Sequence, residues 1–298
     1  MAQITANGLT LECEDFGDKD DPAILLIMGL GAQLTLWPIE LVEALVAGGF
    51  RVIRYDNRDI GLSQKFDGAS FPGIARQVLM GKIGLKPKVP YTLAHMADDA
   101  AGVLDALGIA KAHIVGASMG GMIAQHVAAR HPDRCLSLTT IFSTTGNPSL
   151  PPAKREAMAA LTKRPASAEP EVLVAHGMMI SRTIGSPAYP ADEDRLRANV
   201  IAAMKRSVYP EGMQRQMAAI VHDGDRRKML RQLELPTLVL HGEDDPLVSC
   251  EGGRDIAANI PGARIQTFPG MGHDLPLELL DKIADAIIAH ARAAQPPA

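Results

Sequence analysis

Apolar residues along the chain gather in short runs that alternate with longer amphipathic segments. Eight of the short runs predict β-strands, at residues 3–6, 9–14, 23–28, 51–55, 112–115, 135–142, 237–241 and 264–268. The first two flank Asn7-Gly8, a pair typical of a tight hairpin turn. The run at 23–28 has no polar alternation, which indicates a strand covered on both faces.

Amphipathic segments between these runs predict helices at residues 38–47, 92–107, 122–130 and 277–291, with a further helix between 241 and 264. After the hairpin, strand and helix therefore alternate. This order predicts an α/β fold, with a parallel sheet, right-handed crossovers and helices on both faces.

The alternation breaks between residues 147 and 222. No strand pattern appears there, while helical patterns recur at 153–161, 170–180, 192–207 and 212–222. We interpret this stretch as an inserted helical cap or lid. The predicted organisation is a core formed by residues 1–146 and 223–298, with the cap at 147–222. A second irregular stretch, 66–90, is rich in Gly and Pro and reads as a loop excursion.

Composition narrows the classes of partner. The 298 residues are 47% hydrophobic and 21% charged, and 30 basic against 34 acidic residues give a formal charge of -4. No long run of either sign would attract nucleic acid or anionic lipid, so we expect a small-molecule ligand. The longest apolar runs, such as residues 23–28, are too short to cross a bilayer.

The number and spacing of the cysteines indicate the cellular compartment of the protein. Cys13, Cys135 and Cys250 are odd in number and far apart, with no C-x-x-C spacing. A disulfide framework or a zinc site is therefore not expected, and a reducing cytoplasm suits the chain. The first residues lack the basic start and apolar core of a signal peptide. We expect a cytoplasmic protein, as a monomer or homodimer.

One segment carries a nucleophile pattern. Gly116, Ser118 and Gly120 fit G-x-S-x-G between a predicted strand and a predicted helix. In that context the serine sits on a sharp turn at the top of the sheet. The glycines leave room where strand and helix backbones pass closely, and they tolerate strained dihedral angles. The alternative is a serine that merely occupies a turn.

A serine hydroxyl needs a base to take its proton and a carboxylate to orient that base. In this arrangement the acid and then the histidine follow the serine along the chain. Asp245 and His273 come in that order, each after a predicted strand. Asp244 is the rival acid, but the fourth position counted from Gly242 favours Asp245. A histidine in a glycine turn without a role is the alternative for His273.

Acyl transfer also needs two donors for the oxyanion of the tetrahedral intermediate. One is the backbone N–H after the nucleophile, on Met119. The other comes from the loop after the first core strand, where Leu30 lies between two glycines. Both would donate through the backbone, which leaves their side chains free to line a pocket.

Two further features have alternative readings. Six methionines of the cap segment could form the adaptable upper wall of a binding pocket, or they could simply pack between the cap helices. They are Met158, Met178, Met179, Met204, Met213 and Met217. Trp37, the only tryptophan, could reach the pocket or lie in the core.

These motifs resemble those of the α/β-hydrolases, in the esterase group that includes aclacinomycin methylesterase. The resemblance extends over nearly the whole chain, and it is carried by segments 28–31, 55–59, 116–121, 236–242, 245–246 and 270–273. It implies an eight-stranded sheet, a helical cap, a Ser118, Asp245 and His273 triad, and ester hydrolysis without a cofactor. It also assigns Leu30 and Met119 to the oxyanion hole.

Two departures limit the resemblance. Many relatives carry His-Gly where this chain has Met28-Gly29, which removes a polar group but keeps the amides. The 66–90 excursion is longer than in the methylesterase, and both it and the cap would border the site. The anthracycline substrate is therefore not carried over.

The leading hypothesis is a serine hydrolase acting on a carboxylic ester. Lactonases, cofactor-free perhydrolases and carbon–carbon bond hydrolases resemble the chain equally well around Ser118. Epoxide hydrolases and haloalkane dehalogenases place Asp at that position and are disfavoured. From a different class, a ligand-binding protein could retain the same scaffold, because fold and motif do not prove turnover.

Overall fold

The alternating pattern folds as one eight-stranded sheet in a computed structural model that describes residues 2–73, 76–77, 79–80, 85 and 88–295. Its strands are β1 (Ala2–Ala6), β2 (Leu9–Phe16), β3 (Ala23–Ile27), β4 (Arg51–Tyr55), β5 (Ala112–Ala117), β6 (Cys135–Ile141), β7 (Thr237–Gly242) and β8 (Arg264–Phe268). Each predicted strand is present, with ends that agree within two residues. Their spatial order is β1-β2-β4-β3-β5-β6-β7-β8. Strands β1 and β2 run antiparallel to their neighbours, and the others are parallel.

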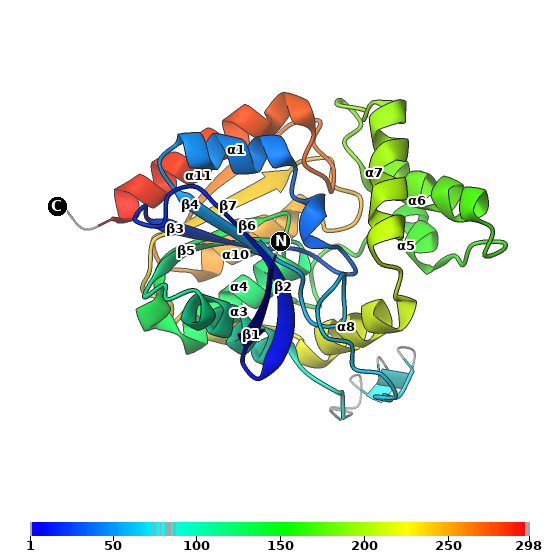
Figure 1. The fold of residues 1–298 in the computed structure, drawn as a ribbon, viewed down its shortest axis with the longest axis horizontal. Coiled ribbons are helices and arrows are strands. Elements are labelled where there is room, and N and C mark those ends of the chain that lie inside the picture. Colours follow the sequence, from blue (N-terminus) through cyan, green and yellow to red (C-terminus); the bar gives the residue numbers. More distant parts are fainter. Residues whose placement is uncertain (1, 74–75, 78, 81–84, 86–87, 296–298) are drawn as a thin grey trace.

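Helices cover both faces of the sheet (Figure 1). One face is covered by α3 (Leu93–Ala106), α4 (Met119–Arg130) and α10 (Cys250–Asn259), and the other by α1 (Ile39–Ala47) and α11 (Leu280–Ala294). Short 3-10 turns lie at Leu34–Leu36, Pro132–Arg134 and Leu277–Leu279. Helix α4 begins three residues earlier than predicted, because Gly120 and Gly121 weaken the helical signal of its first turn.

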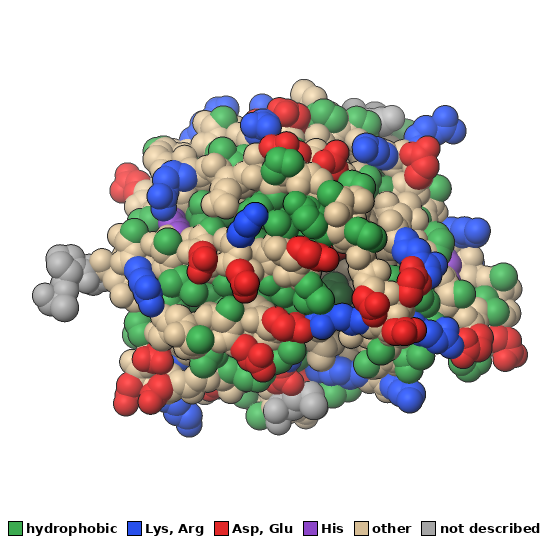
Figure 2. Space-filling view, turned by 90° about the horizontal axis from the view of Figure 1, so that it is seen from above, with side chains coloured by type: hydrophobic (Ala, Val, Ile, Leu, Met, Phe, Trp, Pro, Cys, Tyr) green, Lys and Arg blue, Asp and Glu red, His purple; other side chains and the backbone are tan. Residues whose placement is uncertain are grey.

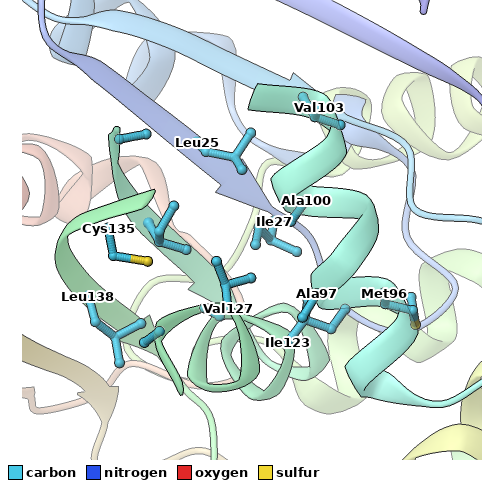
Figure 3. Packing of buried hydrophobic residues seen from close by; sticks show 14 of the residues in the cluster. Leu25, Ile27, Met96, Ala97, Ala100, Val103, Ile123, Val127, Cys135 and Leu138 are labelled. Carbon is cyan, nitrogen blue, oxygen red and sulfur yellow. The ribbon is translucent and has the colours of Figure 1, made fainter. Parts of the chain in front are cut away.

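Strand β3 shows why the sheet needs cover on both sides. Leu25 and Ile27 point into the apolar cluster under α3 and α4, which Figure 3 shows closely packed. Ile24 and Leu26 point into the opposite cluster, under α1 and α11. All four side chains are fully buried, and each contributes roughly 1.5–3 kcal/mol by leaving water. The continuous apolar run thus marks a doubly covered strand, as predicted.

Five helices lie between β6 and β7: α5 (Arg155–Thr162), α6 (Pro170–Ile184), α7 (Glu193–Arg206), α8 (Pro210–Asp223) and α9 (Arg227–Leu230). We call α5–α8 the helical insert. In Figure 1, α5, α6 and α7 lie to the right of the sheet, and α8 lies below them. Helix α9 was not predicted, because a single turn is too short to show a periodic pattern.

The predicted excursion at 66–90 is only partly visible. Residues 74–75, 78, 81–84 and 86–87 lie outside the described residues, and so does part of the short helical pattern near 74–80. Within the described ranges, no helix is long and apolar enough to span a membrane. Figure 2 shows acidic and basic side chains interspersed over one face of the molecule.

The turn between β5 and α4 depends on backbones that pass unusually close together. A Cβ added to Gly116 would lie 2.2 Å from the carbonyl oxygen of Gly120. A Cβ added to Gly120 would lie 1.9 Å from the carbonyl oxygen of Ile27 in β3. Both distances are far below van der Waals contact, so only glycine fits. The predicted reason for these two glycines is confirmed.

Replacing Gly120 by Ala should therefore destabilise the protein strongly. The clash is with backbone atoms that cannot rotate away, and we expect the free energy of unfolding to fall by about 3 kcal/mol or more. Urea denaturation measures the change. Gly73→Ala is the control, because no described heavy atom lies within 4 Å of a Cβ there. Equal unfolding midpoints for the two variants would contradict the packing account.

Candidate active site

Ser118 is the single residue between the end of β5 and the start of α4. Its backbone has φ 57° and ψ -120°, a conformation that side-chain-bearing residues rarely adopt. The Ser118 N–H donates to the Ile141 carbonyl at 2.9 Å. The Ser143 hydroxyl donates to the Ser118 carbonyl at 2.8 Å. These bonds hold a strained turn that costs about 1–3 kcal/mol, as the motif predicted.

A continuous chain of hydrogen bonds starts at this serine. The Ser118 Oγ lies 3.0 Å from His273 Nε2, and His273 Nδ1 lies 2.7 Å from Asp245 Oδ2. Because the Asp245 carboxylate accepts a hydrogen bond from Nδ1–H, the lone pair of Nε2 is free to accept the serine proton. The three residues follow β5, β7 and β8, and the carboxyl ends of parallel strands meet at one edge of a sheet. The structure thus brings together the three side chains that the sequence singled out.

The two candidate acids occupy different environments. The side chain of Asp245 is fully buried, and its Oδ1 accepts the N–H groups of Leu247 and Val248, each at 2.8 Å. Asp244 is exposed and accepts instead the Gly270 N–H at 2.9 Å. Only Asp245 therefore touches the imidazole.

Asp245 is held in its ionised form. Burial by itself raises its pKa, but the electrostatic interaction with His273 and the hydrogen bonds to the carboxylate lower the pKa to about 2. The buried His241 lies nearby, with Nε2 3.6 Å from Asp245 Oδ2. That nitrogen is also 2.8 Å from the Val248 carbonyl, which is the shorter contact. The Asp245 carboxylate is therefore negatively charged where it meets His273 Nδ1.

An aromatic ring also contacts the histidine, and the sequence did not assign it a role. Phe142, directly after β6, lies 4.7 Å from His273 between ring centroids at an interplanar angle of 51°. Its backbone has φ 37°, again a strained value. The only sequence signal was an aromatic residue at the end of the strand beside the serine strand. Phe142 therefore packs against the imidazole of His273.

The helical insert contacts the loop that carries His273 through both backbone and side-chain hydrogen bonds. The His273 N–H donates to the Ile184 carbonyl at the end of α6, at 2.8 Å. Ser186 accepts the Gly272 N–H at 2.9 Å and donates to the Asp274 carboxylate. Burial raises the pKa of Asp274. No sequence pattern indicated these contacts, because they join positions about 90 residues apart.

The backbone N–H groups of Leu30 and Met119 belong to two segments that pack beside Ser118. The loop after β3 passes so close that a Cβ at Gly29 would lie 3.1 Å from Ser118 Cβ. In the part of the chain that the structure describes, neither Leu30 N–H nor Met119 N–H makes a hydrogen bond. The next amide, Gly31 N–H, is taken by Gln216 Oε1 at 2.9 Å. Leu30 and Met119 carry the two amides that the sequence put forward for the oxyanion hole.

The polar loop after β4 holds the loop after β3 in place. Asp56 Oδ1 accepts the Leu34 N–H at 2.7 Å, and Asn57 Nδ2 donates to the Met28 carbonyl at 2.8 Å. Both polar side chains are buried. Four consecutive polar residues after a buried strand were visible in the sequence. The sequence did not indicate that two of them hold the loop after β3 in place through hydrogen bonds.

Other residues that the sequence singled out fall elsewhere. Trp37 is fully buried in the cluster under α1 and α11, so it belongs to the core. Of the insert methionines, Met178 is buried and Met158 is exposed, while Met213 lies against Gly31. The described residues contain no group of three or more His, Cys, Asp or Glu that could hold a metal ion.

Comparison with known proteins agrees with the geometry. A family model for the alpha/beta hydrolase fold matches residues 22–278. Rhodomycin D methylesterase DauP from Streptomyces sp. (strain C5) is 33% identical, over 98% of each chain. DnrP, the enzyme of the same name from Streptomyces peucetius, is 32% identical over the same shares.

A solved structure extends the likeness to three dimensions. The enol-lactonase from Burkholderia xenovorans LB400 superposes with a TM-score of 0.74 at 26% identity, covering 98% of this chain and all of that one. These findings confirm the resemblance drawn from the sequence motifs. The chain belongs to the α/β-hydrolase family.

Proposed function

We propose that this protein is a serine hydrolase that cleaves a carboxylic ester of a small, apolar molecule. The observation that carries the proposal is the hydrogen-bonded chain from Ser118 through His273 to Asp245. Support comes from two relatives of nearly full length that are named methylesterases.

The first half of the reaction forms an acyl-enzyme. Ser118 Oγ attacks the ester carbonyl carbon while its proton passes to His273 Nε2. The carbonyl oxygen gains a negative charge and accepts hydrogen bonds from the Leu30 and Met119 amides. When the intermediate collapses, the C–O bond to the alcohol breaks, and His273 returns the proton to the departing oxygen.

The second half regenerates the serine. Water replaces the alcohol and attacks the acyl carbon while His273 takes one of its protons. The bond between the acyl carbon and Ser118 Oγ breaks, the serine regains a proton, and a carboxylic acid leaves. Asp245 holds the imidazole in the Nδ1–H tautomer throughout. No redox step is involved, and none of these steps requires a cofactor.

We assign the segment 147–222 to a cap over this site, between core parts 1–146 and 223–298. The bonds from Ile184 to the histidine loop and from Gln216 to the loop after β3 support that assignment. Leu30 and Met213 would then border the acyl or alcohol pocket. Three free, buried cysteines suit a reducing cytoplasm.

A lactonase is the second candidate, favoured by the structural likeness to an enol-lactonase. A lactone is a cyclic ester, so the same attack and collapse would open the ring without releasing a separate alcohol. Perhydrolysis and carbon–carbon bond hydrolysis use the same arrangement with another nucleophile or another leaving group. A ligand-binding role on this scaffold would require that the triad is never used.

Replacing Ser118 by Ala should remove turnover while preserving the fold. Without the nucleophile no acyl-enzyme forms, and we expect kcat on p-nitrophenyl esters to fall at least about 10⁴-fold. Steady-state kinetics with circular dichroism on the same sample measures both properties. Wild-type activity in the folded variant would end the serine hydrolase proposal.

A substrate panel should separate the candidate reactions. On short and long aryl esters, lactones, and acetate with peroxide, we expect the highest kcat/KM on aryl or methyl esters, because the named methylesterases are full-length relatives. A lactone preferred by more than about 10-fold would favour the second candidate. Saturable ligand binding without any product would favour a binding protein.

Asp245 should make stability depend on pH in the acid range. In the folded protein its pKa is about 2, below its ordinary value of 3.8, so the ionised form favours folding. This contribution is complete above about pH 5 and is lost as the pH falls towards 2. Between these pH values, we expect wild type to lose about 2 kcal/mol more unfolding free energy than Asp245→Asn. Urea denaturation at each pH is the test, and parallel pH profiles would contradict it.

A further inference from the structure

We propose that Gln216 of α8 is a positioning residue that fixes the loop after β3, so that the Leu30 N–H faces the reacting carbonyl at Ser118. This inference rests on the function proposed above. It assigns part of the catalytic geometry to a side chain of the helical insert, which does not itself touch the reacting atoms.

Gln216 is completely buried and uses both ends of its amide. Its Oε1 accepts the Gly31 N–H at 2.9 Å, and its Nε2 donates to the Arg58 carbonyl at 2.9 Å. One partner is a donor and the other an acceptor, so the amide fits in only one orientation. The side chain therefore links the loop after β3 to the loop after β4. The bond fixes Gly31, and the adjacent Leu30 N–H makes no hydrogen bond within the described ranges.

The chain lets α8 approach closely enough for this link. Gly212 lies one turn before Gln216, on the same face of the helix. A Cβ at Gly212 would lie 2.1 Å from the Asp59 carbonyl oxygen, so the helix backbone nearly touches the loop after β4. Met213 covers the loop after β3, with its Sδ 3.0 Å from where a Gly31 Cβ would be. Gly31 has φ 67°, which a residue with a side chain would find strained.

A separate contact keeps α8 docked. Arg215 binds Asp59 through two hydrogen bonds, at 2.8 and 3.0 Å. Burial raises the pKa of Asp59, but the bonds from Arg215 and Tyr91 outweigh it, and the pKa is lowered overall. The ion pair does not involve Gln216. Removing the Gln216 amide alone should therefore leave the helix in place and release only the loop.

The expected consequence falls on the transition state. Negative charge on the carbonyl oxygen develops as Ser118 attacks. Displacing the Leu30 N–H therefore reduces the stabilisation of the transition state more than it reduces the binding of the ester. A purely structural role for Gln216 would instead lower stability without changing the kinetics of the folded protein. The two possibilities predict different readouts.

The test compares Gln216→Met with Gln214→Met. Methionine has a similar length and removes both hydrogen bonds, while Gln214 is an exposed residue on the same helix. For each variant we would measure kcat and KM on a p-nitrophenyl ester. Inhibition by a trifluoromethyl ketone, which forms a tetrahedral oxyanion adduct, is compared with inhibition by the product carboxylate.

For Gln216→Met we expect kcat to fall about 10-fold or more, with ketone affinity falling in parallel. KM and carboxylate affinity should stay within about 2-fold, and Gln214→Met should match wild type throughout. An unchanged kcat, or a loss confined to KM, would overturn the role of Gln216. A wild-type protein without ester turnover would overturn the proposed function instead.

A measurement on the wild-type protein covers the case in which Gln216→Met does not fold. The Gly31 amide, bonded to a buried side chain, should exchange its hydrogen at least about 100-fold more slowly than in an unstructured peptide. Exchange at the unprotected rate would show that the link is not maintained in solution, and it would overturn the proposal.

Discussion

The site depends on how closely three backbones pass beside Ser118. Strand β5 turns into α4 within one residue, and the first turn of α4 lies directly against the end of β3, where Gly120 approaches Ile27. A side chain at Gly116 or Gly120 would separate these elements. Met119 begins α4 directly after the serine, and Gly29, next to Leu30, packs against Ser118. Gly116 and Gly120, which have no side chains, therefore determine both the packing of α4 against the sheet and the position of the nucleophile.

The loops at this edge of the sheet are held partly from outside the sheet. The helical insert bonds to the histidine loop through Ile184 and to the loop after β3 through Gln216. It is anchored by the ion pair of Arg215 with Asp59, whose side chains are 5% and 0% exposed. Removing one partner of a buried pair of this kind costs about 3–5 kcal/mol. By contrast, the ion pair of Arg182 and Glu193 in the insert is exposed to solvent, and such pairs contribute little to stability.

Much of this arrangement could be predicted from the sequence, because the relevant signals are local. Apolar runs marked all eight strands, and the Gly116, Ser118 and Gly120 spacing marked the strained turn. The order of Ser118, Asp245 and His273 indicated which side chains the sheet edge would bring together, and the structure places them in hydrogen-bond contact.

The rest depends on contacts between distant positions. Phe142 looked like an ordinary strand residue, and nothing near Gln216 in the sequence indicated that its amide meets Gly31, 185 positions away. A glutamine in an amphipathic helix is usually exposed, as Gln214 is. Gln214 and Gln216 are two positions apart and so lie on different faces of α8, and Gly212 lets the face that carries Gln216 approach the loop after β4 closely.

The most direct test of the account is the site of covalent labelling by a fluorophosphonate. The reagent reacts only with a serine whose proton is taken by a neighbouring base and whose adduct oxygen is stabilised by amides. Peptide mapping by mass spectrometry should find one adduct per chain, on the peptide that contains Ser118. Folded protein that stays unlabelled, or that is labelled at another residue, would contradict the account.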